Sequence, residues 1–217
     1  MKYDVAIDRL RRALLCALPG HDEFLQLSGH VRPDLEAVRR ADPSPRESAV
    51  LAVIYPKGDD AHVLLMLRPE YDGVHSGQIA FPGGRREEED PDLQATALRE
   101  FHEETGASTT GLMVLGALSP VYIPPSRSLV TPFVAHTYQL GPLAPDAREV
   151  AALIEAPLAT LLDPDVLRRG DRTVQVMGRD VEVAYFDVDG HMVWGATAMM
   201  ISELRQLLRS LGDSDIR

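Results

Sequence analysis

Two runs of apolar residues separated by a short polar turn are the first regular pattern in the chain. AVLAVIYP occupies residues 49–56 and HVLLMLRP occupies residues 62–69, with KGDDA between them. Paired apolar runs around a Gly-Asp turn predict a β-hairpin. The stretch QIAFPGG at residues 78–84 predicts a third short strand, which the Pro-Gly-Gly at its end should stop.

Further β-type segments fill the C-terminal half. Residues 112–123 and 129–140 are rich in apolar side chains, and the loop PPSRS separates them. Residues 148–164 combine a strand with a short helix. A second hairpin is predicted for residues 172–177 and 182–188, with GRD at its turn.

Amphipathic spacing predicts helices near both ends of the chain, at residues 3–17 and 195–212. Residues 30–48 are rich in Pro, Arg and Asp and predict a connecting arm with about one helical turn. We therefore expect an α/β (α+β) fold with a mixed sheet, in one domain at residues 46–212 after a helical extension at residues 1–45. The predicted apolar positions are Val5, Leu10, Leu14 and Leu15 in the first helix and Met199, Leu204, Leu207, Leu208 and Leu211 in the last.

A further helix is predicted for residues 90–106. Asp90 is a suitable N-cap, Pro91 suits the first helical position, and Gly106 can end the helix. This segment contains an unusual cluster of charge, because three glutamates lie within five positions.

The three glutamates are Glu100, Glu103 and Glu104. Like charges three or four positions apart on a helix destabilise it by a few tenths of a kcal/mol per pair. At roughly 100° per residue the three carboxylates share an arc of about 100°, so we expect them to face outward together. The side that should pack on the sheet carries Leu98, Phe101 and Thr105.

Such an acidic face is either a solvated surface or a site for a hard cation. Mg²⁺ and Mn²⁺ prefer oxygen ligands, and a few clustered carboxylates can hold them beside the phosphates of a substrate. A bound divalent cation would also cancel the repulsion between the glutamates.

Charge and composition narrow the classes of partner. The chain has 217 residues, of which 45% are hydrophobic, and a formal net charge of −11. This charge argues against a nucleic-acid binder, and no apolar run is long enough to span a bilayer. The single cysteine, Cys16, excludes an intramolecular disulfide and favours a reducing, cytoplasmic location. We expect a small-molecule ligand, which needs metal cations or an arginine cluster if it is anionic.

The stretch GGRREEEDPDLQATALREFHEETGA resembles the Nudix box. The resemblance implies a Nudix-type α/β/α sandwich, in which Arg99 orients the glutamates. It implies metal binding by Glu100, Glu103 and Glu104 with the backbone at Gly84, and Mg²⁺ or Mn²⁺ as the cofactor. The second half of the box is filled in order by Arg99, Glu100, Phe101, Glu103, Glu104, Gly106 and Ala107.

The acidic residue near the start of the Nudix box is matched by Asp90. The interval from Asp90 to Arg99 is one residue longer than in the general box. Asp90 is interpreted here as a helix cap and is given no metal role.

Three further segments resemble the coenzyme A diphosphatase branch of this family. They are LLMLRPEYDGVHSGQIAFPGG, SPVYIPPSRSLVTPFVA and WGATAMMISEL, and the resemblance spans roughly residues 49 to 208. The chain departs from the signature at Met66, Pro69 and Gly73. Gly73 stands where the branch has a second arginine, and a guanidinium there would hold a phosphate through two charge-assisted bonds.

Substrate contacts are expected outside the box as well. The candidates are Arg68, Gly77, Arg85, Ser126 and Arg127. Nudix enzymes often take an extra catalytic carboxylate from a late loop, for which Glu149 is the candidate.

The implied reaction is the hydrolysis of a diphosphate linkage. Coenzyme A would give 3′,5′-ADP and 4′-phosphopantetheine. The alternative substrates are ADP-ribose, NADH, a dinucleoside polyphosphate or a nucleoside triphosphate. A non-catalytic Nudix module that only binds a nucleotide or a protein is a rival, although it would usually have lost the glutamates. An RNA-decapping enzyme would need a basic path for the RNA, and neither a nucleic acid nor a membrane is expected as a partner. A homodimer is left open.

Overall fold

The computed structural model describes residues 1–28, 35–70, 76–174 and 179–210. Gly73, Gly178 and Leu211, which the sequence singles out, lie outside these described residues. Within them, no helix is long and apolar enough to cross a membrane. The placement of Arg179 and Asp180 in the turn of the second hairpin is wrong, because both belong to a strand that pairs with residues 173 and 174.

The main sheet is built around β1 (Arg46–Lys57). This strand pairs antiparallel with β2 (Asp60–Leu67), as the predicted hairpin requires, and parallel with β7 (Ser128–His136). The sheet is therefore mixed, and the predicted fold class is confirmed. Its remaining strands are β3 (Ile79–Ala80), β4 (Gly83–Arg85), β5 (Met113–Ala117), β6 (Val121–Ile123) and β8 (Ala152–Pro157).

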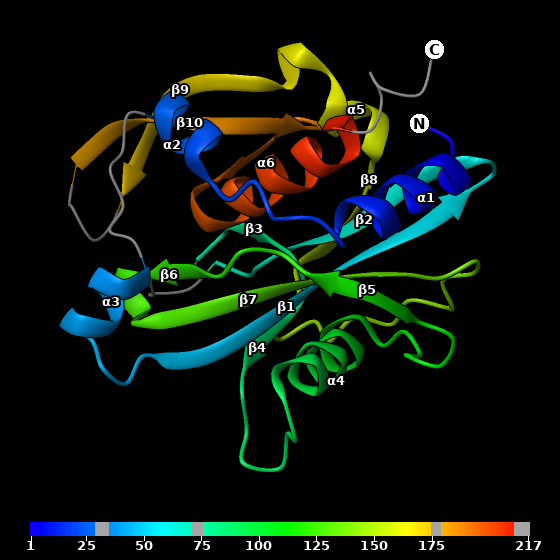
Figure 1. Cartoon of the computed structure of the whole chain (residues 1–217), viewed down its shortest axis with the longest axis horizontal. Coiled ribbons are helices and arrows are strands. Elements are labelled where there is room, and N and C mark those ends of the chain that lie inside the picture. Colours follow the sequence, from blue (N-terminus) through cyan, green and yellow to red (C-terminus); the bar gives the residue numbers. More distant parts are fainter. Residues whose placement is uncertain (29–34, 71–75, 175–178, 211–217) are drawn as a thin grey trace.

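Helices cover both faces of this sheet (Figure 1). The helix α4 (Leu93–Thr105) lies on one face, and α1 (Tyr3–Ala13) and α6 (Gly195–Ser210) lie on the other. A second sheet of three antiparallel strands packs against α6 from the far side. Its strands are β9 (Leu167–Val174), β10 (Arg179–Val188) and β11 (His191–Trp194), and the short helices are α2 (Asp22–Ser28), α3 (Leu35–Ala41), α5 (Leu158–Leu162), η1 (Pro124–Ser126) and η2 (Pro164–Val166).

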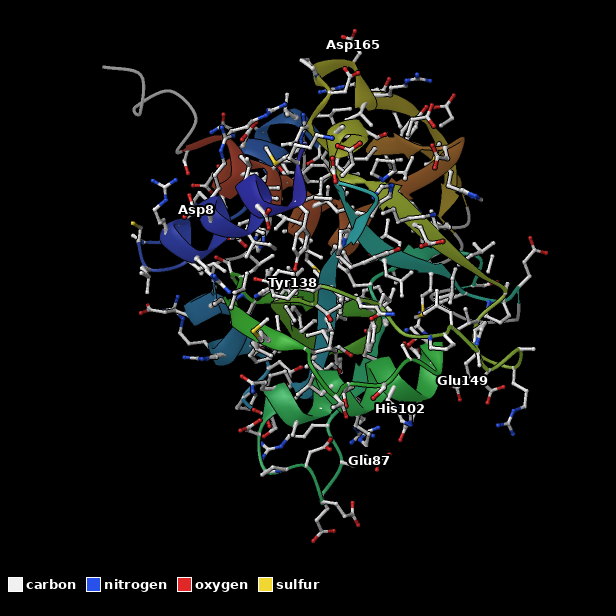
Figure 2. All side chains as sticks on the ribbon, turned by 90° about the vertical axis from the view of Figure 1, so that its right-hand side faces the viewer. Asp8, Glu87, His102, Tyr138, Glu149 and Asp165 are labelled. Atoms are coloured by element: carbon white, nitrogen blue, oxygen red, sulfur yellow. The ribbon has the colours of Figure 1, made fainter. Side chains whose placement is uncertain are left out.

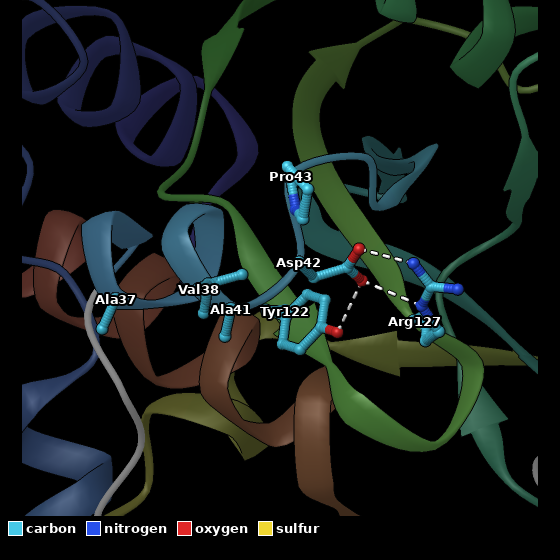
Figure 3. Close-up of a pocket in the computed structure, with 7 residues that line it drawn as sticks. All are labelled: Ala37, Val38, Ala41, Asp42, Pro43, Tyr122 and Arg127. Carbon is cyan, nitrogen blue, oxygen red and sulfur yellow. Dashed lines mark hydrogen bonds and ion pairs between the residues drawn. The ribbon is translucent and has the colours of Figure 1, made fainter.

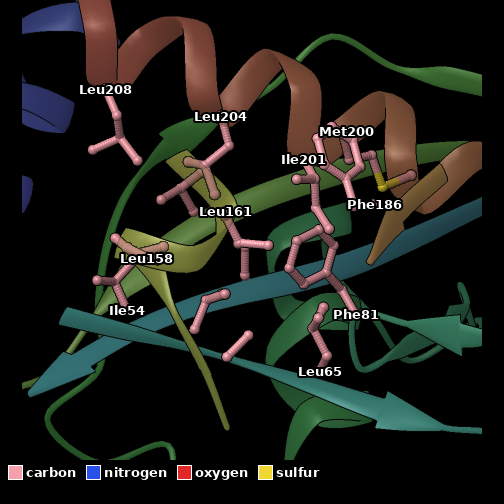
Figure 4. Close-up of a cluster of buried hydrophobic side chains, with 14 of the residues drawn as sticks. Ile54, Leu65, Phe81, Leu158, Leu161, Phe186, Met200, Ile201, Leu204 and Leu208 are labelled. Atoms are coloured by element: carbon pink, nitrogen blue, oxygen red, sulfur yellow. The ribbon is translucent and has the colours of Figure 1, made fainter. Parts of the chain in front are cut away.

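Two hydrophobic cores lie on the two faces of the main sheet. Along β1, Leu51 and Val53 belong to the core beneath α4, whereas Ala52 and Ile54 belong to the core beneath α6. Successive side chains of a strand point to opposite faces, so a strand buried on both sides reads as a continuous apolar run. Figure 4 shows the α6 side, where Ile54 and other sheet residues face the leucines of the helix.

The first helix contributes to the core beneath α6. Leu10 is fully buried there, together with Tyr3 and Ile7. The predicted apolar face of this helix is wrong at Val5 and Leu15, which are exposed. Leu15 lies beyond the end of α1, so helical periodicity no longer describes its direction. The expected division into residues 1–45 and 46–212 stays a prediction.

The structure also corrects several predicted boundaries. The third strand ends at Ala80, before the Pro-Gly-Gly, as predicted, but Gly83 and Gly84 then begin the separate strand β4 and pair with β1. The helix α2, the strand β11 and the full length of α3 were not anticipated. These elements are short, and short segments give too few repeats for periodicity to identify them.

Leu10→Ala tests whether α1 is integral to the fold. Removing a fully buried leucine leaves a cavity, and we expect a loss of about 2–5 kcal/mol in the free energy of unfolding. Val5→Ala, on the exposed side of the same helix, should change it by less than about 0.5 kcal/mol. Equal effects in urea-induced unfolding would contradict this packing.

Candidate active site

The acidic helix α4 begins and ends through local capping. Asp92 is its N-cap, and the side chain accepts a hydrogen bond of 2.8 Å from the backbone N–H of Ala95. The helix ends at Gly106, which has a left-handed backbone with φ of 69°. The prediction for Gly106 is confirmed, whereas the placement of the N-cap at Asp90 and of the first helical position at Pro91 is wrong.

Arg99 connects Asp90, which precedes the helix, to Glu100 and Glu103 within it. Its Nε and Nη2 atoms donate to the two carboxylate oxygens of Asp90, at 3.1 and 2.9 Å. Its Nη1 atom donates to Glu100 and to Glu103, at 3.0 Å each. A planar guanidinium that is held on one edge by a buried carboxylate presents its other edge in a fixed direction. Asp90 is therefore the acidic partner of Arg99.

Glu104 is buried, which the helical wheel did not predict. Only 2% of this residue is exposed, and its Oε2 atom accepts a hydrogen bond of 2.7 Å from the N–H of Gly83. Arg68 lies on its other side, with Nη2 3.6 Å from Oε1 of Glu104. The three carboxylates thus do not all face outward, because the approach of β4 covers one of them.

Gly84 lies directly against the carboxylate of Glu100. A Cβ atom at Gly84 would stand 2.4 Å from both carboxylate oxygens of Glu100. At Gly83 it would stand 2.3 Å from the carbonyl oxygen of Ala49 and 2.5 Å from Cα of Val50. The two glycines therefore let β4 approach both the acidic helix and β1.

Burial and mutual repulsion govern the charges of these carboxylates. Burial is the main cause that raises the pKa of Glu104 to about 7, and the nearby charges of Glu100 and Glu149 add to the rise. Arg68 and the N–H of Gly83 act in the opposite direction. The pKa of Glu100 is also raised, again mainly by burial, although Arg99 lowers it. Figure 2 views the side of the molecule on which the exposed Glu149 lies.

The residues fit a hard divalent cation in their chemistry. Among the described residues, no three acidic, histidine or cysteine side chains already converge as metal ligands. Arg99 draws Glu100 and Glu103 toward itself, and Glu104 is directed at Gly83. The available donors are nevertheless all oxygens, and the contact at Gly84 brings backbone beside Glu100. A cation would offset both the burial and the mutual repulsion that raise the pKa of Glu100 and Glu104.

The remaining predicted site residues lie in two regions. Gly77 and Arg85 lie around β3 and β4, whereas Ser126 and Arg127 lie at η1. Arg85 is exposed in β4, and its carbonyl oxygen accepts a hydrogen bond of 3.0 Å from Arg99. Gly77 precedes β3 in a left-handed conformation with φ of 61°. Ser126 ends η1, and its hydroxyl donates to the carbonyl of Ile123 at 3.4 Å.

Arg127 lies beside a hollow of about 320 Å³ next to α3 (Figure 3). Its guanidinium makes two hydrogen bonds to Asp42, and the hydroxyl of Tyr122 donates to the same carboxylate. The hydrogen bonds from Arg127 are the main cause that lowers the pKa of Asp42 to about 2. Arg127 thus has an anionic partner within the chain, which the sequence did not reveal because Asp42 is distant along it. The hollow is lined by Ala37, Val38, Ala41, Asp42, Pro43, Tyr122 and Arg127.

Comparison with known proteins identifies the family. The model of the NUDIX domain matches residues 45–173. The Photorhabdus laumondii protein named uncharacterized Nudix hydrolase NudL is 34% identical over 168 residues, covering 77% of this chain and 88% of that protein. Nudix hydrolase 15, mitochondrial, from Arabidopsis thaliana is 32% identical over 163 residues, covering 71% of this chain and 55% of that protein.

Solved structures agree in fold. The Nudix hydrolase RenU from M. smegmatis has a TM-score of 0.54 at 20% identity, covering 77% of this chain and 88% of that chain. A Nudix hydrolase from Alicyclobacillus acidocaldarius has a TM-score of 0.52 at 19% identity, covering 76% of this chain and 92% of that chain. The chain belongs to the Nudix hydrolase family, whose members generally use divalent metal ions.

Replacing Gly83 or Gly84 by alanine should lower the stability of the fold by different amounts. Gly83→Ala forces a Cβ atom into the backbone of β1, and we expect a loss of about 1–3 kcal/mol in the free energy of unfolding. Gly84→Ala meets only the movable end of Glu100, and we expect a loss below about 1 kcal/mol. Thermal unfolding measures both, and a larger loss for Gly84→Ala would contradict the geometry.

The raised pKa of Glu104 should make the metal-free protein less stable as the pH rises. Its pKa lies near 7 in the fold and at the ordinary value of 4.5 when the chain is unfolded, so the fold binds this proton more tightly. The resulting stabilisation is fully present below pH 4.5 and is lost as the pH rises through 7. By linkage it amounts to about 3 kcal/mol at most.

Glu104→Gln keeps the shape of the side chain but replaces the carboxyl group with an amide that does not titrate. We expect the variant to lose less stability than the wild type between pH 5 and pH 8 in the presence of a chelator. Melting temperatures at the two pH values provide the measurement. The same pH dependence in both proteins would show that Glu104 does not titrate in this range.

Proposed function

We propose that this Nudix hydrolase cleaves the diphosphate linkage of a nucleotide derivative, using the carboxylates of α4. The observation that carries the proposal is the contact of Glu100 and Glu104 with Gly84 and Gly83 of β4, close enough to Glu149 for its charge to act on both carboxylates. Burial raises the pKa of Glu104 and of Glu100, and the negative charge of Glu149 adds to both rises. Gly84 brings backbone against Glu100. Such a site favours a divalent cation and, through it, an anionic substrate.

Each residue has a proposed role. Glu100, Glu103 and Glu104, with the backbone at Gly84, would hold Mg²⁺ or Mn²⁺, and Arg99 would orient Glu100 and Glu103. The bound cation supplies charge neutralisation at the phosphates and a lowered pKa of water. In the hydrolysis, a water oxygen forms a bond to phosphorus and the bridging P–O bond breaks. Glu149 is the proposed acceptor of the water proton.

Coenzyme A or one of its derivatives is the proposed substrate. The support is the resemblance of three segments to the coenzyme A diphosphatase branch, which would make 3′,5′-ADP and 4′-phosphopantetheine the products. Arg85 is exposed, directly follows Gly84 in β4, and is a proposed phosphate contact. Arg127, in contrast, is paired with Asp42, so a substrate would have to displace an internal partner.

The class of substrate, the compartment and the extent of the domain are proposed from the composition and pattern of the sequence. We infer a small-molecule substrate rather than a nucleic acid from the net charge of −11. The single cysteine favours a reducing compartment such as the cytoplasm. We further infer that residues 46–212 form the hydrolase domain and residues 1–45 an extension of it.

A panel of diphosphates tests this function. Purified protein with Mg²⁺ or Mn²⁺ is incubated with coenzyme A, NADH, ADP-ribose, a dinucleoside polyphosphate or a nucleoside triphosphate, and the products are separated by chromatography. We expect coenzyme A to be cleaved to 3′,5′-ADP. Glu103→Gln and Glu104→Gln should each lower kcat by about 100-fold or more, because each removes a proposed cation ligand.

Asp165→Asn serves as the control, because Asp165 is exposed and lies far from α4 (Figure 2). Its activity should equal that of the wild type. Preference for another member of the panel would overturn the coenzyme A assignment and keep the chemistry. Unchanged activity in both glutamate variants would overturn the proposed site.

A further inference from the structure

Two arginines divide the carboxylates of the site between them. Arg99 contacts Asp90, Glu100 and Glu103. Glu104 instead lies beside Arg68, which comes from a different part of the chain, directly after β2. The Nudix box contains Arg99, whereas Arg68 lies well outside it.

Arg68, Glu104 and the peptide groups of Gly83 form a closed set of contacts. The N–H of Gly83 donates to Oε2 of Glu104 at 2.7 Å. The carbonyl of Gly83 accepts from Nη2 of Arg68 at 3.1 Å, and the same nitrogen lies 3.6 Å from Oε1 of Glu104. Both polar groups of Gly83 are therefore satisfied by side chains, and the carboxylate of Glu104 has a contact on each oxygen.

The backbone around Arg68 is fixed on two sides. Its own N–H donates to the carbonyl of Gln78 at 3.0 Å. The carbonyl of the preceding Leu67 accepts from Ala151 at 2.8 Å, in the segment that leads on from Glu149. Arg68 thus starts from a position held between β3 and β8, and Nη2 of its guanidinium is directed at Gly83 and Glu104.

We propose that Arg68 is a positioning residue that holds Glu104 and the Gly83–Gly84 strand in place, rather than a ligand of the substrate phosphates. The expected effect on kcat rests on the proposed function, whereas the expected effect on the Gly83 amide does not. Arg68 acts on Glu104 through a charge contact of 3.6 Å and through its hydrogen bond to the carbonyl of Gly83, whereas Arg99 donates directly to Glu100 and Glu103. A lysine could not reproduce it, since a point charge on a flexible stem lacks the directed, planar donors of a guanidinium.

The test replaces Arg68 by methionine, which keeps the length and apolar stem of the side chain. Arg12→Met is the control, because it makes the same replacement at an exposed arginine of α1, on the face of the sheet opposite α4. Hydrogen exchange of the Gly83 amide is measured by NMR in the metal-free proteins. Steady-state kinetics with the best substrate of the panel follow.

We expect exchange of the Gly83 amide to become at least about tenfold faster in Arg68→Met and to stay unchanged in Arg12→Met. kcat should fall by about tenfold or more, with KM within about threefold of the wild type. Arg68→Lys should not restore either value.

Two results would overturn the inference. Unchanged exchange at Gly83 would show that Arg68 does not hold this strand, and a raised KM with an unchanged kcat would make it a substrate ligand. If the wild type cleaves nothing on the panel, the proposed function fails, but the exchange measurement still decides the role of Arg68.

Discussion

The burial of the Glu104 carboxylate against Gly83 of β4 is the constraint on which the site depends. A carboxylate taken out of water is costly unless hydrogen bonds and opposite charges compensate it. Here the N–H of Gly83 and the guanidinium of Arg68 provide part of that compensation, while Glu100 and Glu149 oppose it. The pKa of about 7 shows that the compensation is incomplete, which leaves a site that a cation would stabilise.

The rest of the fold holds the two sides of this contact together. Phe101 is fully buried beneath the sheet, and α4 presents Glu100 and Glu104 toward β4. The central strand β1 supports β4 from its other side, and its side chains fill a core on each face of the sheet. Arg99 and Asp90 then connect α4 to the loop that follows β4.

Much of this arrangement can be predicted from the sequence because it depends on local patterns. The β1–β2 hairpin, the last helix and the end of α4 at Gly106 follow from apolar spacing and turn residues. The fixed spacings around Arg99 identified the acidic helix. Contacts between distant segments could not be predicted in the same way. Nothing in the local sequence indicates that β4 covers Glu104, or that Asp42 pairs with Arg127.

Asp90 and Asp92 show how one residue type serves two purposes. Asp90 and Asp92 both suit an N-cap, and local chemistry does not choose between them. Asp92 takes that position in the structure, which leaves Asp90 buried as the partner of Arg99. The position of Asp90 in the box was the available signal, although its interval to Arg99 is one residue longer than usual.

Equilibrium binding of Mn²⁺, followed by electron paramagnetic resonance without substrate, tests the central claim most directly. The wild type should bind Mn²⁺ saturably. Glu100→Gln and Glu104→Gln should each weaken that binding by about tenfold or more, while Asp165→Asn leaves it unchanged. Equal affinity in all four proteins would contradict the assignment of the cation to the carboxylates of α4.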